Sequence, residues 1–172
     1  MKQLEHQETQ WSQGQFPIIV ACDNWSDPRN VGMAFRLADA FGVEAIWLGG
    51  TTPQPPNRKI RRTARMTTDW VSWTVQPDLA SAVKDRSANG YTAIGIEITN
   101  SSFKLRDYVR SQLPERVILV LGAEKEGIDE NILAILDDCI HIPMHGRNSS
   151  LNVATALAIS LEAFSSAYSQ SQ

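Results

Sequence analysis

The stretch CIHIPMHGRNSSLNVATALAISLEAFSSAY, residues 139–168, decides how the chain is expected to fold. A short apolar strand meets Pro143, and a polar turn then leads to Ser150, which we expect to cap a long helix. Asn152 lies two residues beyond this cap. Only a few polar residues interrupt the first turns of the helix, namely Thr155, Ser160 and Glu162. Because the helix is apolar on nearly every side, something beyond its own sheet has to cover it.

The rest of the chain alternates short apolar runs with helical patterns. Runs rich in β-branched residues predict strands at residues 18–21, 45–48, 71–75, 91–98, 117–121 and 139–142. Apolar residues at helical spacing predict helices at residues 30–41, 57–66, 78–88, 129–136 and 150–168, with 103–113 weakly helical at best. This alternation indicates an α/β fold with a mainly parallel sheet flanked by helices.

Length and composition fit one globular domain. The chain has 172 residues, of which 42% are hydrophobic and 20% are charged. We expect residues 1–15 to be a flexible N-terminal extension and residues 16–172 to be a single domain. No run is long enough to cross a bilayer, so we expect a cytoplasmic protein with no membrane partner. The two cysteines, Cys22 and Cys139, are expected to remain free.

Charge is distributed unevenly along the chain. The net charge of −3 argues against binding nucleic acid through the overall field. Between Glu44 and Asp69, however, there is no acidic residue, and this segment holds a cluster of basic side chains: Arg58, Lys59, Arg61, Arg62 and Arg65. If this segment is a helix, the four arginines lie on one face, as expected for contacts to RNA phosphates. A solvated helix face explains the same pattern equally well.

Several familiar sites do not match the sequence. Residues 121–129, LGAEKEGID, lack the lysine and hydroxyl of a phosphate-binding loop, and residues 149–150 sit in no nucleophile elbow. Three potential metal ligands remain, Cys139, His141 and His145. Since Pro143 prevents a helix from aligning them and no fourth ligand is evident, we expect no metal site.

Ligands of open α/β sheets bind beyond the carboxyl ends of the strands, so the junctions there are candidates for function. Three junctions stand out: the opening stretch, DNWSDPRNVGMAFR at residues 23–36, and LGAEKEG at residues 121–127. In the second, Asn30 is a candidate helix cap and Arg36 lies within the next two turns. In the third, Glu124 lies between two glycines.

Together these junctions resemble the three ordered motifs of a known family. The segments are NVGMAFRLADAFGVEAIWL from residue 30, LGAEKEGI from residue 121 and IPMHGRNSSLNVATALAISLEA from residue 142. They look like the motifs of the SpoU/TrmH-like family of RNA 2'-O-ribose methyltransferases, within the SPOUT superfamily. The resemblance implies methylation of a ribose 2'-hydroxyl in RNA with S-adenosylmethionine.

The resemblance also implies a fold and a cofactor site. Such proteins have a C-terminal trefoil knot, an exception to unknotted topology, and the knot forms the cofactor pocket. The matching positions put a set of residues at S-adenosylmethionine: Gly122, Ile142 and Leu151, with Leu121, Met144 and Glu97 nearby. Loops suit this ligand because their backbone groups are free to hydrogen-bond it.

The catalytic positions of the family match five residues of this chain: Asn30, Arg36, Glu124, Ser150 and Asn152. The resemblance assigns deprotonation of the hydroxyl to Arg36. Because arginine is normally a fixed cation, we expect Arg36 instead to hold an RNA phosphate and to stabilise the developing alkoxide. The other four would orient the arginine, the hydroxyl and the loops. Each has a plainer interpretation as a helix cap, a first-turn polar residue, a surface carboxylate or an ion-pair donor.

Family members form homodimers through the last helix and the helix of the first motif, so we expect a second copy to cover the apolar helix. We expect Arg58, Arg61, Arg62 and Arg65 to contact RNA, with tRNA favoured over rRNA. A catalytically silent RNA-binding protein with the knotted fold, and an unrelated nucleotide-binding α/β protein, remain alternatives.

Overall fold

The computed structural model describes residues 2, 14–148 and 150–171. Within them a seven-stranded sheet has the order β3-β2-β1-β6-β4-β7-β5, and every pairing is parallel. The strands are β1 Phe16–Asp23, β2 Val43–Gly49, β3 Trp73–Gln76, β4 Thr92–Ile96, β5 Phe103–Lys104, β6 Val117–Leu121 and β7 Asp138–His141. The helices are α1 Pro28–Ala40, α2 Arg58–Ala64, α3 Leu79–Ser87, α4 Leu105–Ser111, α5 Glu130–Leu133 and α6 Val153–Gln170, with a short 3-10 helix η2 at Thr67–Asp69.

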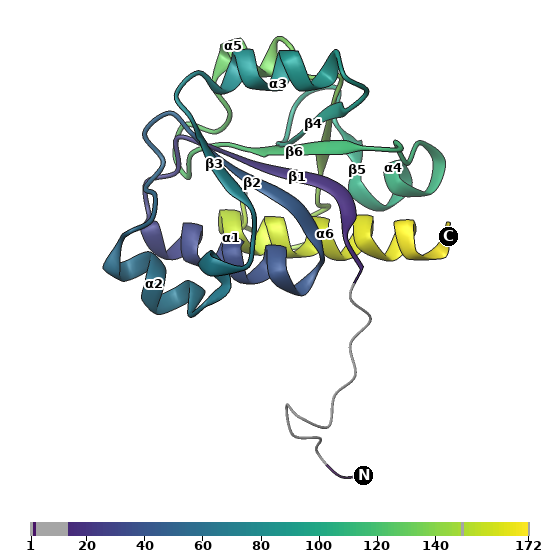
Figure 1. Ribbon diagram of the computed structural model, residues 1–172. Coiled ribbons are helices and arrows are strands. Elements are labelled where there is room, and N and C mark those ends of the chain that lie inside the picture. Colours follow the sequence, from purple (N-terminus) through teal and green to yellow (C-terminus); the bar gives the residue numbers. More distant parts are fainter. Residues whose placement is uncertain (1, 3–13, 149, 172) are drawn as a thin grey trace.

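Helices cover both faces of the sheet, as Figure 1 shows. Alternate residues of β1 explain how one strand serves two cores. Ile18 and Val20 pack into the cluster beneath α1, α2, α4 and α6, whereas Ile19 and Ala21 pack into the cluster beneath α3 and α5. The sheet is therefore buried on both sides, which confirms the α/β fold with a parallel sheet. The trefoil knot stays a prediction.

Several predicted element bounds were wrong. The sequence indicated six strands, and the missed strand is β5, whose two residues are too few to give a period-2 pattern. The segment 103–113 is instead a strand followed at once by α4. The expected helix at residues 129–136 is the shorter α5. Of the predicted extension at residues 1–15, residues 1 and 3–13 lie outside the described residues.

Both predicted helix caps were also wrong. Helix α1 begins at Pro28, and the cap is Asp27, whose side chain accepts from the N–H of Arg29 at 2.8 Å; Asn30 lies inside the first turn. Helix α6 begins after Asn152, which replaces Ser150 as the cap. Ser, Asp and Asn side chains cap helices about equally well, so capping preference by itself did not rank neighbouring candidates.

Helix α6 packs against α1 and α4 within the chain. Its buried side chains include Leu157, Leu161 and Phe164, which face the sheet and the neighbouring helices. Ile159, however, is 37% exposed on the opposite side. The helix therefore has an apolar position that the described part of the chain does not cover. No helix of that part is long and apolar enough to cross a membrane.

Candidate functional site

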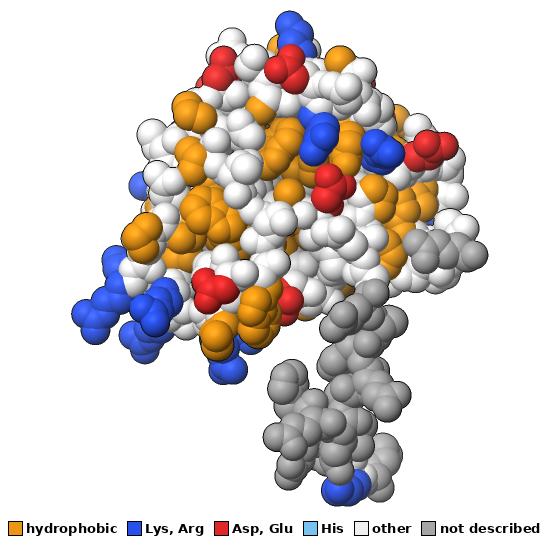
Figure 2. Space-filling model, viewed as in Figure 1, with side chains coloured by type: hydrophobic (Ala, Val, Ile, Leu, Met, Phe, Trp, Pro, Cys, Tyr) orange, Lys and Arg blue, Asp and Glu red, His pale blue; other side chains and the backbone are white. Residues whose placement is uncertain are grey.

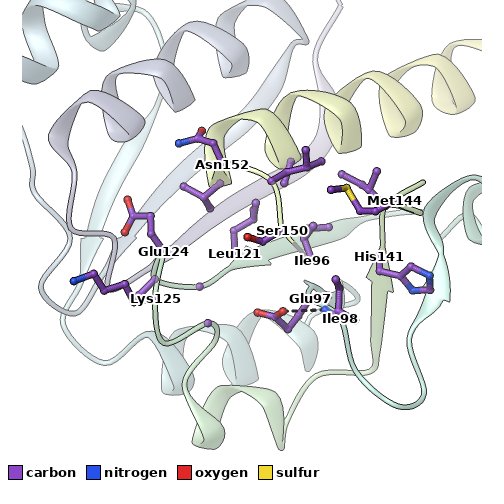
Figure 3. A pocket seen from close by; sticks show the side chains of 17 residues that line it. Ile96, Glu97, Ile98, Leu121, Glu124, Lys125, His141, Met144, Ser150 and Asn152 are labelled. Carbon is purple, nitrogen blue, oxygen red and sulfur yellow. Dashed lines mark hydrogen bonds between the residues drawn. The ribbon is translucent and has the colours of Figure 1, made fainter. Parts of the chain in front are cut away.

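A pocket of about 510 Å³ lies beyond the carboxyl ends of β4, β6 and β7. Its walls come from three segments that are far apart in the sequence, within residues 96–98, 121–127 and 141–156. Figure 3 places Glu124 and Lys125 at one end of this pocket and Met144 and His141 at the other. The volume is in the range that small-molecule ligands occupy, about 300–1,000 Å³.

All the residues predicted to contact a cofactor line this pocket: Glu97, Leu121, Gly122, Ile142, Met144 and Leu151. Three of the predicted catalytic residues line it as well: Glu124, Ser150 and Asn152. The structure therefore brings two of the three sequence motifs together around one cavity, along with the end of β4.

Backbone packing explains why Gly122 occupies the wall after β6. A Cβ atom there would lie 2.0 Å from the carbonyl carbon of Gly127, a separation that no real side chain tolerates. The loop closes on itself through Ala123, whose N–H donates to Gly127 O at 2.9 Å and whose oxygen accepts from Gly127 N–H at 3.0 Å. Trp25 Nε1 also donates to Leu121 O at 2.9 Å from a fully buried position. These hydrogen bonds and the close packing hold this wall of the pocket in place.

The opposite wall is irregular chain. Among the described residues between 143 and 151, no backbone–backbone hydrogen bond joins any of them to another described residue. Within the described residues these N–H and C=O groups have no backbone partner, so they can bind a ligand, as the sequence predicted for a loop-built site. Met144 and Leu151 add apolar surface to this wall.

Glu97 presents a carboxylate to the floor of the pocket. Its Oε1 accepts from the N–H of Ile98 at 2.9 Å (Figure 3). A Cβ built on Gly127 would come within 2.8 Å of Glu97 Oε2. The carboxylate of Glu97 therefore lies directly against the backbone of Gly127. A carboxylate in this place can accept from hydroxyl or ammonium groups of a ligand.

A chain of polar side chains joins the first motif to the other two. Glu124 Oε1 accepts from Asn30 Nδ2 at 2.8 Å, and Asn30 Oδ1 accepts from Asn152 Nδ2 at 3.2 Å. The carboxylate fixes the direction of these hydrogen bonds because it can only accept them, so the Asn30 amide nitrogen must face it. Asn30 is thus held at the edge of the pocket without lining it.

Glu124 is a carboxylate at neutral pH. Partial burial acts to raise its pKa, but hydrogen bonds from Asn30 and from the backbone and hydroxyl of Ser26 outweigh burial and lower the pKa below its ordinary value. A carboxylate stabilised in this way is a poor proton donor. Its role is to hold Asn30 and the turn before α1 in place.

Asn152 serves two structures at once. Its Oδ1 caps α6 by accepting from the N–H groups of Ala154 at 2.9 Å and Thr155 at 3.3 Å, while its Nδ2 reaches Asn30. The plainer interpretation of Asn152 as a first-turn polar residue therefore gives way to a cap that also contacts Asn30. Ser150 is exposed, and it lines the pocket two residues before the cap.

Arg36 lies apart from these residues. It is exposed on α1, it does not line the pocket, and within the described residues it makes no hydrogen bond or ion pair. The plainer interpretation of Arg36 as an ion-pair donor is therefore wrong for this part of the chain. The guanidinium is available to an external anion.

The basic cluster lies on α2 and at its end, outside the pocket: Arg58, Lys59, Arg61, Arg62 and Arg65 are all exposed. Figure 2 shows these Lys and Arg side chains projecting at one corner of the molecule. Helix α2 packs against the first turns of α1, where a Cβ on Gly32 would lie 2.7 Å from Thr63 Cβ. The expectation that all four arginines share a helix was wrong for Arg65, which follows α2 with a φ of 60°.

Sequence reasoning missed Ser26. Its N–H and hydroxyl both contact Glu124 Oε2, at 3.1 and 2.9 Å, so it helps to orient the carboxylate. The signal was present, since Ser26 lies in the polar turn between β1 and α1. The described residues contain no group of three His, Cys, Asp or Glu side chains placed to hold a metal ion.

Comparison with known proteins identifies the family. Residues 17–162 match the model of the SpoU rRNA methylase family. The chain belongs to this family. SpoU relatives include the tRNA (guanosine(18)-2'-O)-methyltransferase of Thermus thermophilus, which is 31% identical over 84% of this chain and 72% of its own length. A second is the 23S rRNA (guanosine(2553)-2'-O)-methyltransferase RlmP of Bacillus subtilis, 32% identical over 82% of this chain and 55% of its own.

Solved SpoU-type structures share the fold. An rRNA methyltransferase from Sinorhizobium meliloti, described as AdoMet-bound, superposes with a TM-score of 0.79 at 25% identity, covering 88% of this chain and 57% of the other. The chain spans between 9% and 59% of the length of four of its curated SpoU relatives.

Proposed function

We propose that this SpoU chain is an S-adenosylmethionine-dependent RNA ribose 2'-O-methyltransferase and that tRNA is its substrate. The observation that carries the proposal is the junction of the three motifs: the pocket of about 510 Å³ is built from the second and third, and Asn30 of the first is hydrogen-bonded to its edge. Relatives named for 2'-O-methylation of tRNA and of rRNA support the same chemistry.

The pocket fits S-adenosylmethionine in chemistry and size. Apolar side chains such as Leu121, Ile142 and Leu151 would flank the adenine ring, and the unpaired backbone between residues 143 and 151 would bind its edge. Glu97 would accept from ribose hydroxyls or from the ammonium group. When bound, the cofactor supplies a methyl group on a sulfonium centre, which is electrophilic.

The chain's own residues would prepare the ribose hydroxyl. Asn152 and Ser150, at the pocket rim, would orient the hydroxyl toward the cavity, and Glu124 would keep Asn30 from rotating. Arg36 would bind the neighbouring RNA phosphate and stabilise the alkoxide as the hydroxyl proton passes to that phosphate. Its exposure and its lack of an internal partner support this role for an external anion.

The active form would be a homodimer in the cytoplasm, as the sequence led us to expect. Helices α1 and α6 pack together, and Ile159 leaves an apolar position open beside them. A twofold-related copy would cover this surface and could bring Arg36 near a pocket. The knotted path of the C-terminal segment belongs to the same proposal.

The decisive experiment uses the purified chain with S-adenosylmethionine, total tRNA and ribosomal RNA in separate reactions. After nuclease digestion, mass spectrometry should detect a new 2'-O-methylated nucleoside in tRNA, and Arg36→Ala should abolish it. Methylation of rRNA alone would show that the substrate is rRNA instead of tRNA. If RNA binds but the cofactor does not, as measured by calorimetry, the catalytically silent protein is the correct interpretation.

A further inference from the structure

The turn that follows α2 carries an exposed tryptophan beside the basic cluster. Trp70 is 65% exposed and Met66 is 60% exposed, the two largest fractions among the large hydrophobic side chains of the described residues. Trp25 and Trp47, by contrast, are buried. Figure 2 shows hydrophobic side chains at the surface next to the Lys and Arg side chains of α2.

The backbone beneath Trp70 is held rigidly. Thr67 is buried and its Oγ1 donates to Ala64 O at 2.8 Å. The N–H groups of Trp70 and Val71 then both donate to Thr67 O, at 3.2 and 3.0 Å. The indole therefore projects from a fixed turn, and a ligand that binds it would not have to order the chain first.

Arg65 occupies a backbone conformation that suits glycine. Its φ is 60° and its ψ is −116°, a region that side chains with a Cβ rarely adopt. Its N–H donates to Arg61 O at 3.0 Å, so this bend is what ends α2 and begins the turn toward Trp70. An arginine in a position where glycine would fit without strain is a candidate for a side chain with a function.

Charge narrows the choice of ligand. Residues 45–68 contain no Asp or Glu, while Arg58, Lys59, Arg61, Arg62 and Arg65 lie within them; Asp69, next to Trp70, is acidic and exposed. A second copy that met this surface with the same face, related by a twofold axis, would bring the same positive charge and would be repelled. A ligand with regular negative charges and flat apolar faces matches both the cations and the indole, and single-stranded RNA has these two properties.

We propose that Trp70 stacks on an unpaired base of the substrate RNA while Arg65 contacts an adjacent phosphate. The proposal rests on the proposed function, because α2 packs on α1, which carries Asn30 and Arg36. Bases within a duplex are already stacked on each other, so the tryptophan selects single-stranded loops or ends. It gives this SpoU chain a specificity element outside its pocket.

The test compares two probes on the 172-residue chain by fluorescence anisotropy: a single-stranded oligouridylate and an RNA duplex with the same number of phosphates. Trp70→Ala should weaken binding of the oligouridylate about tenfold and leave duplex binding unchanged. Trp70→Phe, which keeps an aromatic face, should retain most of the affinity. Val75→Ala, at an exposed apolar residue of β3, is the matched control and should behave as the wild type.

Arg65→Gly separates the phosphate contact from the stacking contact. It should weaken binding of both probes to a similar extent and raise the melting temperature, because glycine relieves the strained backbone. A glycine variant that binds both probes as the wild type does would overturn the role of Arg65.

Calorimetry with S-adenosylmethionine distinguishes failure of this proposal from failure of the proposed function. A Trp70→Ala protein that binds the cofactor normally and also holds the oligouridylate as tightly as the wild type overturns the stacking role alone. Absence of cofactor binding in the wild type counts against the proposed function instead. A change in self-association by sedimentation, with unchanged RNA affinity, would assign Trp70 to contacts between copies and overturn the proposal.

Discussion

Asn152 Nδ2 donates a hydrogen bond to Asn30 Oδ1 at 3.2 Å, although 122 residues separate the two in the sequence. The same Asn152 side chain caps α6 through its oxygen. One amide therefore both starts the last helix and joins the third motif to the first. The two contacts can be separated, because an aspartate at this position keeps the cap but cannot donate to Asn30.

Asn152→Asp should keep the helix cap and lose the donor to Asn30. We expect a melting temperature close to the wild type but a strong loss of methyl transfer. Asn152→Ala loses both contacts and should also destabilise the protein by about 1 kcal/mol, the usual cost of removing a cap. Thermal unfolding and methylation assays on both variants check this, and equal activity in the Asp variant would contradict it.

Glu124→Gln should lower methyl transfer by about tenfold or more, because one amide nitrogen would then face donors that now meet a carboxylate. The pKa of Glu124 is lowered in the folded protein, so its contribution to stability is present at neutral pH and is lost as pH falls through that pKa. The melting temperatures of wild type and variant should therefore converge in acid, below about pH 4. A difference in melting temperature that widens in acid would contradict a lowered pKa for Glu124.

Gly122→Ala should weaken cofactor binding strongly, since the new Cβ would collide with the backbone of Gly127 and displace the loop. Gly14→Ala is the matched control, because a Cβ there meets no atom within 4 Å and the residue does not line the pocket. Isothermal titration with S-adenosylmethionine should show at least a tenfold loss of affinity for the first variant and none for the second. Normal binding by the Gly122 variant would remove this loop from the cofactor site.

Replacing Arg58, Arg61 and Arg62 with Gln should weaken RNA binding and make it less dependent on salt. Each phosphate contact to a single strand contributes about 0.7 to the slope of log affinity against log salt, so the slope should fall by about 2. The control removes three exposed charges elsewhere, at Lys104, Arg106 and Arg110. If both triple variants lose affinity equally, α2 has no special role.

Ile159→Asp should produce a monomer by sedimentation velocity, because a charge would replace the exposed apolar position of α6 at the proposed twofold contact. Val75→Asp places the same charge on β3, where the side chain is 36% exposed against 37% for Ile159, and should leave the dimer intact. A monomeric wild type that still methylates RNA would exclude the dimer.

Much of the site could be predicted because the motifs are continuous in sequence. The resemblance placed Leu121, Gly122 and Ile142 at one ligand, and the structure brings them to one pocket. What it could not give is the hydrogen-bond chain through Asn30, since contacts across 94 and 122 residues depend on the strand order. That order, with β1 beside β6, leaves no trace in the local pattern.

The errors at single residues, such as the cap of α1, can be explained from the residues themselves. The residue before Pro28 is the cap of α1, and proline at the first helical position was a usable signal for Asp27 over Asn30. Ser26 was overlooked because a serine in a turn is ordinary until a carboxylate from a distant loop is seen to meet it. The exposure of Trp70 was equally invisible, since tryptophan is more often buried than exposed.

The close packing at Gly32 has a mechanical consequence. With no side chain between them, the backbones of α1 and α2 touch, and a Cβ on Gly32 would come within 2.8 Å of Ile60 O. Closely packed elements transmit displacement instead of absorbing it. Helix α2, which we propose binds RNA, and helix α1, which carries Asn30, are therefore expected to tilt together, so a displacement of α2 would also move Asn30.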